Sequence, residues 1–336
     1  LDFSASINPL GPPATVMAAI QAQLSHLVAY PDPEYVALRQ AIATAHDLDP
    51  AWIMPGNGAA ELLNWAARAM TRYQSVFLPT PAFRDYGRAL VAVGAPLQRC
   101  PLREFSAAGM LAAIAQGISQ LGGTPQQSAL LLNNPHNPTG VMVSRDDLLA
   151  WLDYFGLVVV DEAFMDFLPP DAQQSCDRLV LDHPNLVVVR SLTKFYSIPG
   201  LRIGYAIAHP ERLALWQQWR DPWAVNCLAE VAAIAALADR EFQQTTWAWL
   251  ESARTELSVG LAAIPGLHPY ASVANFLLVR SDYSIPRLQQ ELLQRDRLLI
   301  RDCESFPELG DRYARVAVKT TADHQRLLAG LQAILT

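Results

Sequence analysis

The sequence predicts an α/β protein with a large domain built on a mostly parallel sheet sandwiched by helices, and a small α+β domain at the C-terminal end. Up to Arg220, short apolar runs alternate with stretches of helical spacing. The runs are apolar throughout, which is typical of strands buried on both faces of a parallel sheet. Beyond Arg220 the pattern changes to two long helices followed by a smaller set of strands and helices.

The chain begins with a segment too rich in Pro and Gly for a regular element, Leu1–Pro13, which we expect to be an extended arm. Helical spacing follows over Ala14–Leu27. We therefore assign residues 1–28 to an N-terminal arm and helix. The next helix, Tyr35–His46, follows a turn at Tyr30-Pro31-Asp32-Pro33.

Residues 29–225 make up the predicted large domain. A helix opens at Pro55–Glu61 and ends near Met70. The expected strands are Ser75–Leu78, Ala129–Leu132, Leu157–Val160, Leu186–Val189 and Leu201–Ala208, with helices at Phe83–Val93 and Arg145–Tyr154. In such sheets, ligands bind at the carboxyl ends of the strands.

Residues 226–336 make up the predicted small domain, whose first helix, Ala224–Ala238, starts just before this boundary. The other expected helices are Phe242–Leu261, Arg287–Arg295 and Ala322–Leu335, and the expected strands are Asn275–Val279, Leu299–Arg301 and Tyr313–Val318.

Composition excludes several classes of function. A net charge of −7 without basic clusters argues against nucleic acid or an anionic membrane as partner. Four cysteines lie far apart and predict reduced thiols in a cytoplasmic protein. Seven histidines lack metal-ligand spacing, so we expect no metal. No Gly-x-Gly-x-x-Gly follows the first strand, which argues against a nicotinamide dehydrogenase.

The most informative segment surrounds Lys194, one of only two lysines among 25 basic residues. Ser191 and Arg202 lie close by in sequence, and hydroxyl groups with a guanidinium suit a phosphate monoester. A lysine retained beside a phosphate site in a lysine-poor chain predicts a reactive amine of the kind that forms a Schiff base with pyridoxal phosphate.

Other polar motifs follow predicted strands. Gly58 precedes a helix whose first amides, at Ala59 and Ala60, suit an anion. Asn137 lies in a loop made rigid by prolines after one strand. Asp161 ends an apolar strand, where an unpaired carboxylate would be costly and a protonated pyridine nitrogen would be a suitable partner.

The segment Ser-Leu-Thr-Lys-Phe-Tyr-Ser-Ile-Pro-Gly-Leu-Arg, together with Asn-Pro-Thr-Gly and Asp-Glu-Ala-Phe, resembles the signatures of the class I/II aminotransferases. These are fold-type-I enzymes that use pyridoxal 5'-phosphate. The likeness extends over nearly the whole chain.

The resemblance implies a role for each matching residue. Lys194 would carry the cofactor, Asp161 would pair with its ring nitrogen, and Asn137 would hydrogen-bond its phenolic oxygen. The remaining cofactor contacts would come from Gly58, Ala59, Ala60, Phe83 stacked on the ring, Ala163 beside the ring face, Ser191, Arg202, and Tyr30 donated across a homodimer.

Within that family the chain resembles the threonine-phosphate decarboxylases of cobalamin biosynthesis. The resembling segments are the arm Leu-Asp-Phe-Ser-Ala-Ser-Ile-Asn-Pro-Leu-Gly, the segment around Lys194, Pro-Trp-Ala-Val-Asn, and Phe164 where Tyr would be the alternative. The implied activity is decarboxylation of a small phosphorylated amino acid, L-threonine O-3-phosphate. The implied carboxylate ligand is Arg315, and Ser6, Asn8 and Arg301 are further candidates for substrate contacts.

Two alternatives remain open at this point. A histidinol-phosphate aminotransferase would share these motifs and would need a second amino-acid substrate. A binding module that senses through a retained cofactor site is a different class. The presence of the lysine, the aspartate and two arginines argues against such a binding module.

Overall fold

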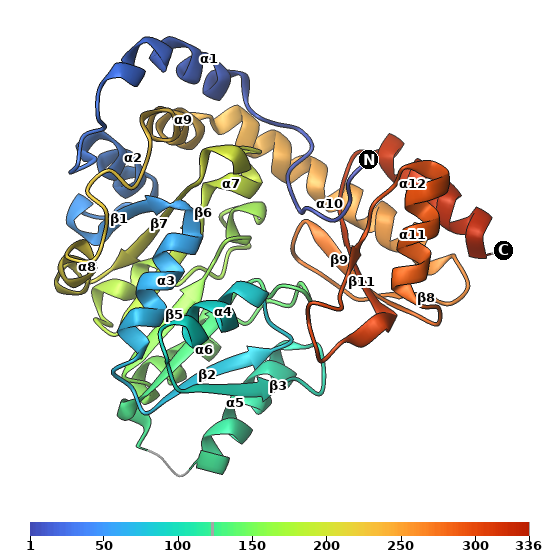
Figure 1. Ribbon diagram of the computed structural model, residues 1–336, viewed down its shortest axis with the longest axis horizontal. Coiled ribbons are helices and arrows are strands. Elements are labelled where there is room, and N and C mark those ends of the chain that lie inside the picture. The colour runs from blue at the N-terminus through green and yellow to red at the C-terminus, as the bar shows by residue number, and fades with distance from the viewer. Residues whose placement is uncertain (122–123, 336) are drawn as a thin grey trace.

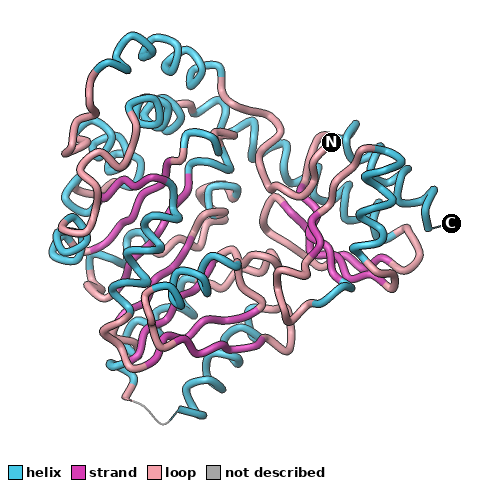
Figure 2. The backbone as a smooth tube through the Cα atoms, in the orientation of Figure 1, coloured by secondary structure: helices cyan, strands magenta, loops and turns pink. Residues whose placement is uncertain are grey.

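The computed structural model describes residues 1–121 and 124–335. Within these residues the strands form a seven-stranded and a four-stranded sheet. The two sheets lie side by side and occupy different halves of the molecule (Figures 1 and 2). This arrangement confirms the predicted mostly parallel sheet with a smaller α+β unit following it.

The large sheet has the strand order β1-β7-β6-β5-β4-β2-β3. All its neighbouring pairs are parallel except those of β7, which runs antiparallel to β1 and β6. Only a short helix and a turn join β6 to β7, so β7 returns alongside β6 in the opposite direction. The strands are β1 (Ile53–Asn57), β2 (Ser75–Thr80), β3 (Leu97–Pro101), β4 (Ser128–Asn133), β5 (Leu157–Asp161), β6 (Leu186–Ser191) and β7 (Ile203–Ala208).

Helices cover both faces of this sheet, which is why its strands are apolar throughout. On β5, Val158 and Val160 belong to one buried cluster, whereas Leu157 and Val159 belong to the other. The Val159 face packs against α3 (Gly58–Met70), α4 (Arg84–Ala92) and α8 (Pro210–Gln217). The Val160 face packs against α2 (Val36–His46), α5 (Ala107–Leu121) and α6 (Arg145–Tyr154).

The small sheet is antiparallel, with strand order β10-β11-β9-β8. Two helices, α11 (Ile285–Asp296) and α12 (Thr321–Leu335), pack on one face, and a small cluster around Phe306 covers the other. The strands are β8 (Leu267–Pro269), β9 (Phe276–Ser281), β10 (Arg301–Asp302) and β11 (Tyr313–Ala317).

Two segments connect the halves. The N-terminal arm lies beside the small sheet, where the Phe3 amide donates to the Leu299 carbonyl at 2.7 Å and the Ala317 amide donates to the Phe3 carbonyl at 2.9 Å. It then crosses to α1 (Ala14–Gln23), which packs on α9 (Cys227–Ala238). The long helix α10 (Arg240–Ala262) also runs from one half to the other (Figure 1).

Several elements differ from the sequence-based expectation. Strands β1, β3 and β8 and helices α5, α7 and α8 were not predicted. Strand β1 contains Pro55 and Gly56, and β3 is a partly exposed edge strand, so neither has the pattern of a buried apolar strand. The first helix ends as an α-helix at Gln23 and continues as a 3-10 turn. The boundary between residues 225 and 226 stays a prediction. In the described ranges, every helix is too short or too polar to cross a membrane.

Candidate active site

The carboxyl ends of β4, β5 and β6 bring three polar loops together. Asp161 is the last residue of β5, and Ser191 is the last residue of β6 and the N-cap of the short helix α7 (Leu192–Phe195). Asn133, at the end of β4, accepts a hydrogen bond from the Asn137 amide at 2.7 Å and donates to the Asp161 carbonyl at 2.7 Å. The three loops therefore have a defined mutual geometry.

Lys194 lies on α7 at this edge of the sheet. Its Nζ is 3.3 Å from the Ser191 hydroxyl oxygen and 5.2 Å from the centroid of the Phe164 ring. Burial lowers the pKa of the Lys194 amine; Asp161 counteracts this, and Arg202 and Arg315 add to it. An amine with a lowered pKa is more available as a nucleophile.

Asp161 is a buried carboxylate at the end of an apolar strand. Its Oδ1 accepts from the Ala163 amide at 2.9 Å, and its Oδ2 accepts from the Tyr86 hydroxyl at 2.7 Å. Burial raises the pKa of this carboxyl, and the nearby Lys194 and these two donors oppose the rise. Within the part of the chain that the structure describes, Asp161 forms no direct ion pair.

The amino-terminal end of α3 lies close to Arg202, because two glycines allow the backbone to approach it. Gly58, the first residue of α3, has a φ of +74°, and a Cβ on it would lie 2.5 Å from Nη2 of Arg202. On β7, a Cβ at Gly204 would lie 2.7 Å from the amide nitrogen of Ala59. Glycine at both positions lets the first amides of α3, including those of Ala59 and Ala60, lie beside a guanidinium and the Ser191 loop. Amides at a helix start together with a guanidinium form an anion site.

Arg315 on β11 connects the small sheet to the Asn137 loop. Its Nη1 donates to Asn137 Oδ1 at 2.7 Å, its Nη2 donates to the Ser4 carbonyl at 2.8 Å, and its guanidinium lies 5.3 Å from the Phe276 ring centroid. The Nε of Arg315 is buried without a partner in the described residues. Burial lowers the pKa of Arg315 to about 10, so it remains charged at neutral pH.

The other three candidates for substrate contacts lie in different environments. Arg301 is exposed on β10, directly opposite Arg315 in the ladder, and donates to Ser305. Ser6 is buried, and its hydroxyl has no partner among the described residues. The Asn8 amide group donates to Phe195 O and Thr246 Oγ1 and accepts from Leu10 N, so its polar atoms are occupied in holding the arm.

Two aromatic candidates differ in exposure. Phe83 precedes α4 and is 37% exposed, with its ring 5.5 Å from that of Tyr86 in an edge arrangement. Tyr30 is 80% exposed and packs against Trp223 at 4.6 Å between ring centroids. Within this single chain, the exposed Tyr30 ring therefore has room for a further contact.

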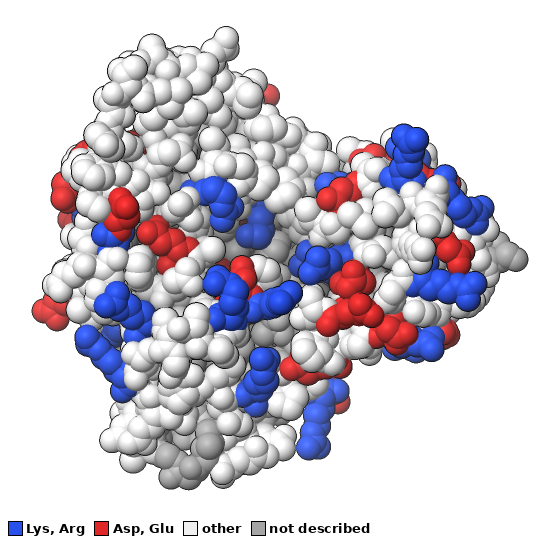
Figure 3. All heavy atoms as spheres, in the orientation of Figure 1, with Lys and Arg blue, Asp and Glu red and all other residues white. Residues whose placement is uncertain are grey.

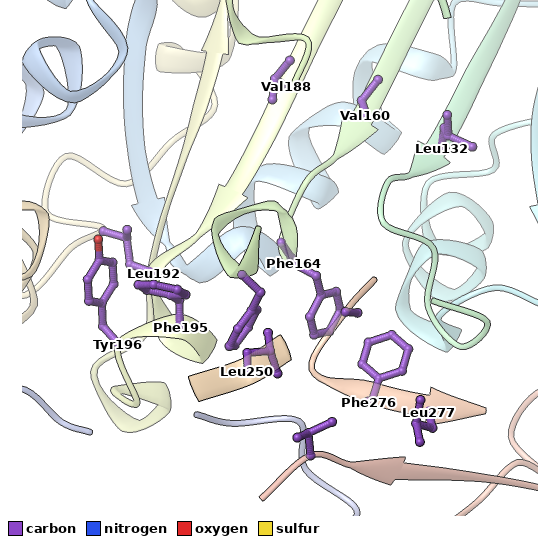
Figure 4. Packing of buried hydrophobic residues seen from close by; sticks show 14 of the residues in the cluster. Leu132, Val160, Phe164, Val188, Leu192, Phe195, Tyr196, Leu250, Phe276 and Leu277 are labelled. Atoms are coloured by element: carbon purple, nitrogen blue, oxygen red, sulfur yellow. The ribbon is translucent and has the colours of Figure 1, made fainter. Parts of the chain in front are cut away.

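Two aromatic residues of the site were missed by sequence reasoning. Tyr86 donates to Asp161, and its only signal is its position three residues after Phe83 on one helix face. Phe276 packs edge-on against Phe164 with 5.0 Å between ring centroids, and these two rings face each other between the strand ends and β9 in Figure 4. No local pattern marks Phe276, because its partner lies 112 residues away in the sequence.

The charges of the site fit pyridoxal phosphate. Lys194, Arg202 and Arg315 are close enough to influence one another, and Asp161 is the acid that most directly offsets Lys194. Figure 3 shows basic side chains bordering the hollow between the two halves of the molecule. Arg202 with the α3 amides could hold the phosphate, Lys194 could hold the aldehyde carbon, and Asp161 could hold the ring nitrogen. Among the described residues, no group of three His, Cys, Asp or Glu side chains could hold a metal ion.

This α/β fold, with an aspartate and a lysine at the ends of two neighbouring strands and an anion site at the start of α3, is that of the fold-type-I pyridoxal-phosphate enzymes. The model of the family "Aminotransferase class I and II" matches residues 1–333, and the chain belongs to that family.

Relatives of two kinds are similar to this chain, decarboxylases and aminotransferases. The chain is 39% identical to the threonine-phosphate decarboxylase of Salmonella typhimurium, covering 100% of this chain and 91% of the relative. It is 33% identical to histidinol-phosphate aminotransferase 2 of Ralstonia nicotianae, covering 98% of this chain and 87% of the relative. Its fold is similar to the crystal structure of the histidinol-phosphate aminotransferase from Clostridium acetobutylicum, with a TM-score of 0.89, 27% identity, and coverage of 99% and 98% of the two chains.

Proposed function

We propose that this protein is a pyridoxal-phosphate-dependent lyase that decarboxylates L-threonine O-3-phosphate. The product is (R)-1-aminopropan-2-ol O-2-phosphate, the precursor of the aminopropanol linker of cobalamin. The observation that carries the proposal is the 39% identity, over the whole chain, to a threonine-phosphate decarboxylase. The arrangement of cationic groups agrees with a substrate that bears both a carboxylate and a phosphate.

Arg315 and Arg301 are the groups proposed to bind that substrate. They occupy opposite positions of an antiparallel ladder, so their side chains leave the same face of the small sheet. Arg315 is anchored by Asn137 and the arm, which suits it to the carboxylate, whereas Arg301 is exposed and free to reach a phosphate. Ser6, whose hydroxyl has no partner in the part of the chain that the structure describes, is a further donor for the phosphate.

The residues of the large sheet are proposed to hold the cofactor. Arg202, Ser191 and the amides that follow Gly58 bind its phosphate. Asp161 keeps a proton on the ring nitrogen, and Asn137 donates from its Nδ2 to the phenolic oxygen while its Oδ1 accepts from Arg315. Phe83 covers one ring face, and small Ala163 leaves room at the other.

Bound pyridoxal phosphate supplies the electron sink for the bonding pair released when the substrate carboxylate leaves Cα as CO₂. The arginines determine which Cα bond stands perpendicular to the ring, because they fix the carboxylate and phosphate and thus the rotation about Cα. The ammonium of Lys194 then delivers a proton to Cα. This proton takes the place of the departed carboxylate. Phe164 carries no hydroxyl, so Asn137 is the proposed donor to the phenolic oxygen.

The active assembly is proposed to be a homodimer in which Tyr30 contacts the cofactor phosphate of the partner subunit. Support comes from the exposed apolar side chains near Tyr30, namely Leu24, Leu27, Val28 and Trp223. A Tyr30→Phe variant should bind pyridoxal phosphate more weakly without dissociating in sedimentation. We place the protein in the cytoplasm, in keeping with four free cysteines.

The test of the proposed function uses two parallel reactions of the purified protein with pyridoxal phosphate. One contains L-threonine O-3-phosphate, and CO₂ and aminopropanol phosphate are measured. The other contains L-glutamate with imidazole acetol phosphate, and histidinol phosphate is measured. We expect stoichiometric CO₂ in the first reaction, its loss in Lys194→Ala, and no product in the second. Histidinol phosphate without CO₂ would identify an aminotransferase instead.

A further inference from the structure

In the described ranges of the chain, Tyr86 is the only residue whose side chain hydrogen-bonds to the Asp161 carboxylate. The hydroxyl donates to Oδ2 at 2.7 Å, and both residues are buried. The second oxygen, Oδ1, accepts from the Ala163 amide at 2.9 Å. A buried carboxylate without an ion pair depends on such donors to stay charged, because burial otherwise favours its neutral form.

The position of Tyr86 on α4 gives this hydrogen bond a second consequence. Phe83 precedes the helix by one residue and lies three residues before Tyr86, so both side chains project from the same helix end. Their rings meet edge-on at 5.5 Å. One helix start therefore supplies the aromatic ring proposed to cover the cofactor and the hydroxyl that orients the carboxylate.

The Tyr86 hydroxyl is suited to remain the donor in its hydrogen bond to Asp161. Burial, reinforced by the negative charge of Asp161, raises the pKa of its hydroxyl well above the ordinary value. The phenol consequently keeps its proton at neutral pH and donates it to Asp161.

We propose that Tyr86 is a positioning residue that holds the Asp161 carboxylate ionised and aimed at the ring nitrogen of pyridoxal phosphate. This inference rests on the proposed function, since it takes Asp161 to be the ligand of that nitrogen. Tyr86 itself touches neither the cofactor nor the substrate; it acts through Asp161 and, by packing, through Phe83.

The experiment compares Tyr86→Phe with the natural protein in binding two ligands to the cofactor-free form. The ligands are pyridoxal phosphate and a deaza analogue in which carbon replaces the ring nitrogen. Tyr86→Phe keeps the ring against Phe83 and removes only the hydroxyl. Tyr73→Phe is the matched control, because its hydroxyl donates to the Gly156 carbonyl at 2.9 Å, away from Asp161. Dissociation constants come from tryptophan fluorescence, and thermal melting verifies folding.

We expect Tyr86→Phe to weaken binding of pyridoxal phosphate roughly tenfold or more, as for loss of a hydrogen bond to a charged group. Binding of the deaza analogue should change little, because it has no ring nitrogen for Asp161 to hold. Equal weakening for both ligands would mean a merely structural role, and no weakening for pyridoxal phosphate would also overturn the inference. If the natural protein binds no pyridoxal phosphate, the proposed function fails first, so the two failures are distinguishable.

Discussion

Arg301 and Arg315 face each other across the β10–β11 ladder, two like charges at directly opposite positions. Such pairs are destabilising in a sheet unless an anion lies between them. Arg315 is anchored by Asn137 and Ser4, whereas Arg301 is exposed and hydrogen-bonds only to Ser305 among the described residues. The pair therefore favours binding of a substrate with two anionic groups.

Replacing Arg301 by Gln should raise KM for L-threonine O-3-phosphate roughly 10- to 100-fold, the range for a lost hydrogen bond between charged groups. The folded state should not be destabilised, because this side chain is exposed and the substitution removes a contact between like charges. The measurement is steady-state kinetics of CO₂ release at several salt concentrations. Arg280→Gln is the control, since Arg280 belongs to the same sheet but pairs with Asp282. An unchanged KM in Arg301→Gln would remove this residue from the substrate site.

Replacing Gly58 by Ala should weaken binding of pyridoxal phosphate at least tenfold. The new methyl group would lie 2.5 Å from Arg202 Nη2 and would displace the guanidinium from the anion site. Gly94→Ala is a close control, because Gly94 also has a positive φ, +70°, but a Cβ built on it would meet no atom of the described residues within 4 Å. Both variants should lose about 1 kcal/mol of unfolding free energy through backbone strain. Equal cofactor affinity in the two variants would contradict the proposed anion site at the start of α3.

Arg190 forms a buried ion pair behind the site, 3.0 Å from Glu162, and also pairs with Asp166. Arg190→Met should lower the free energy of unfolding by about 3–5 kcal/mol, because the buried Glu162 carboxylate loses its cation. The double variant Arg190→Met, Glu162→Leu should recover part of that loss. Urea denaturation measures both.

The control for this prediction is Arg88→Gln, which breaks the exposed pair with Asp85. It should cost less than about 1 kcal/mol, as exposed ion pairs do. A loss from Arg190→Met no larger than that would mean that the buried pair does not stabilise the strand ends.

His136 makes stability depend on pH. Its ring is buried, its Nδ1 lies 2.8 Å from Thr139 Oγ1, and burial lowers its pKa to about 4. Below the unfolded value of about 6.5 the unfolded chain binds a proton that the folded chain excludes. The contribution of His136 to the free energy of unfolding is therefore complete above pH 6.5 and declines by about 3 kcal/mol as the pH falls to 4.

The measurement is urea denaturation between pH 4 and 7 for the natural protein and His136→Asn. The variant should show a shallower loss of stability with falling pH. His26→Asn, at an exposed position, should retain the natural slope. Parallel curves for all three proteins would show that His136 is not the responsible group.

Much of the large sheet could be predicted because a strand buried on both faces is recognisable from composition alone. Leu186–Val189 and Leu157–Val160 are examples, and both lie within strands of the structure. Strand β1 was not predicted, because Met54-Pro55-Gly56 has the sequence pattern of a turn. In the structure, pairing with β7 and packing against α3 hold this segment extended. Tertiary pairing thus overrode local propensity at the sheet edge.

By itself, the sequence determined the fold class and the chemical groups, because both are encoded in neighbouring residues: apolar runs make the strands, and Lys194 and Asp161 follow two of them. Only the tertiary structure decided which groups meet. Tyr86 reaches Asp161 across 75 positions, and Arg315 reaches Asn137 across 178. Such contacts depend on how helices and sheets pack, and no local pattern specifies a partner that far away in the chain.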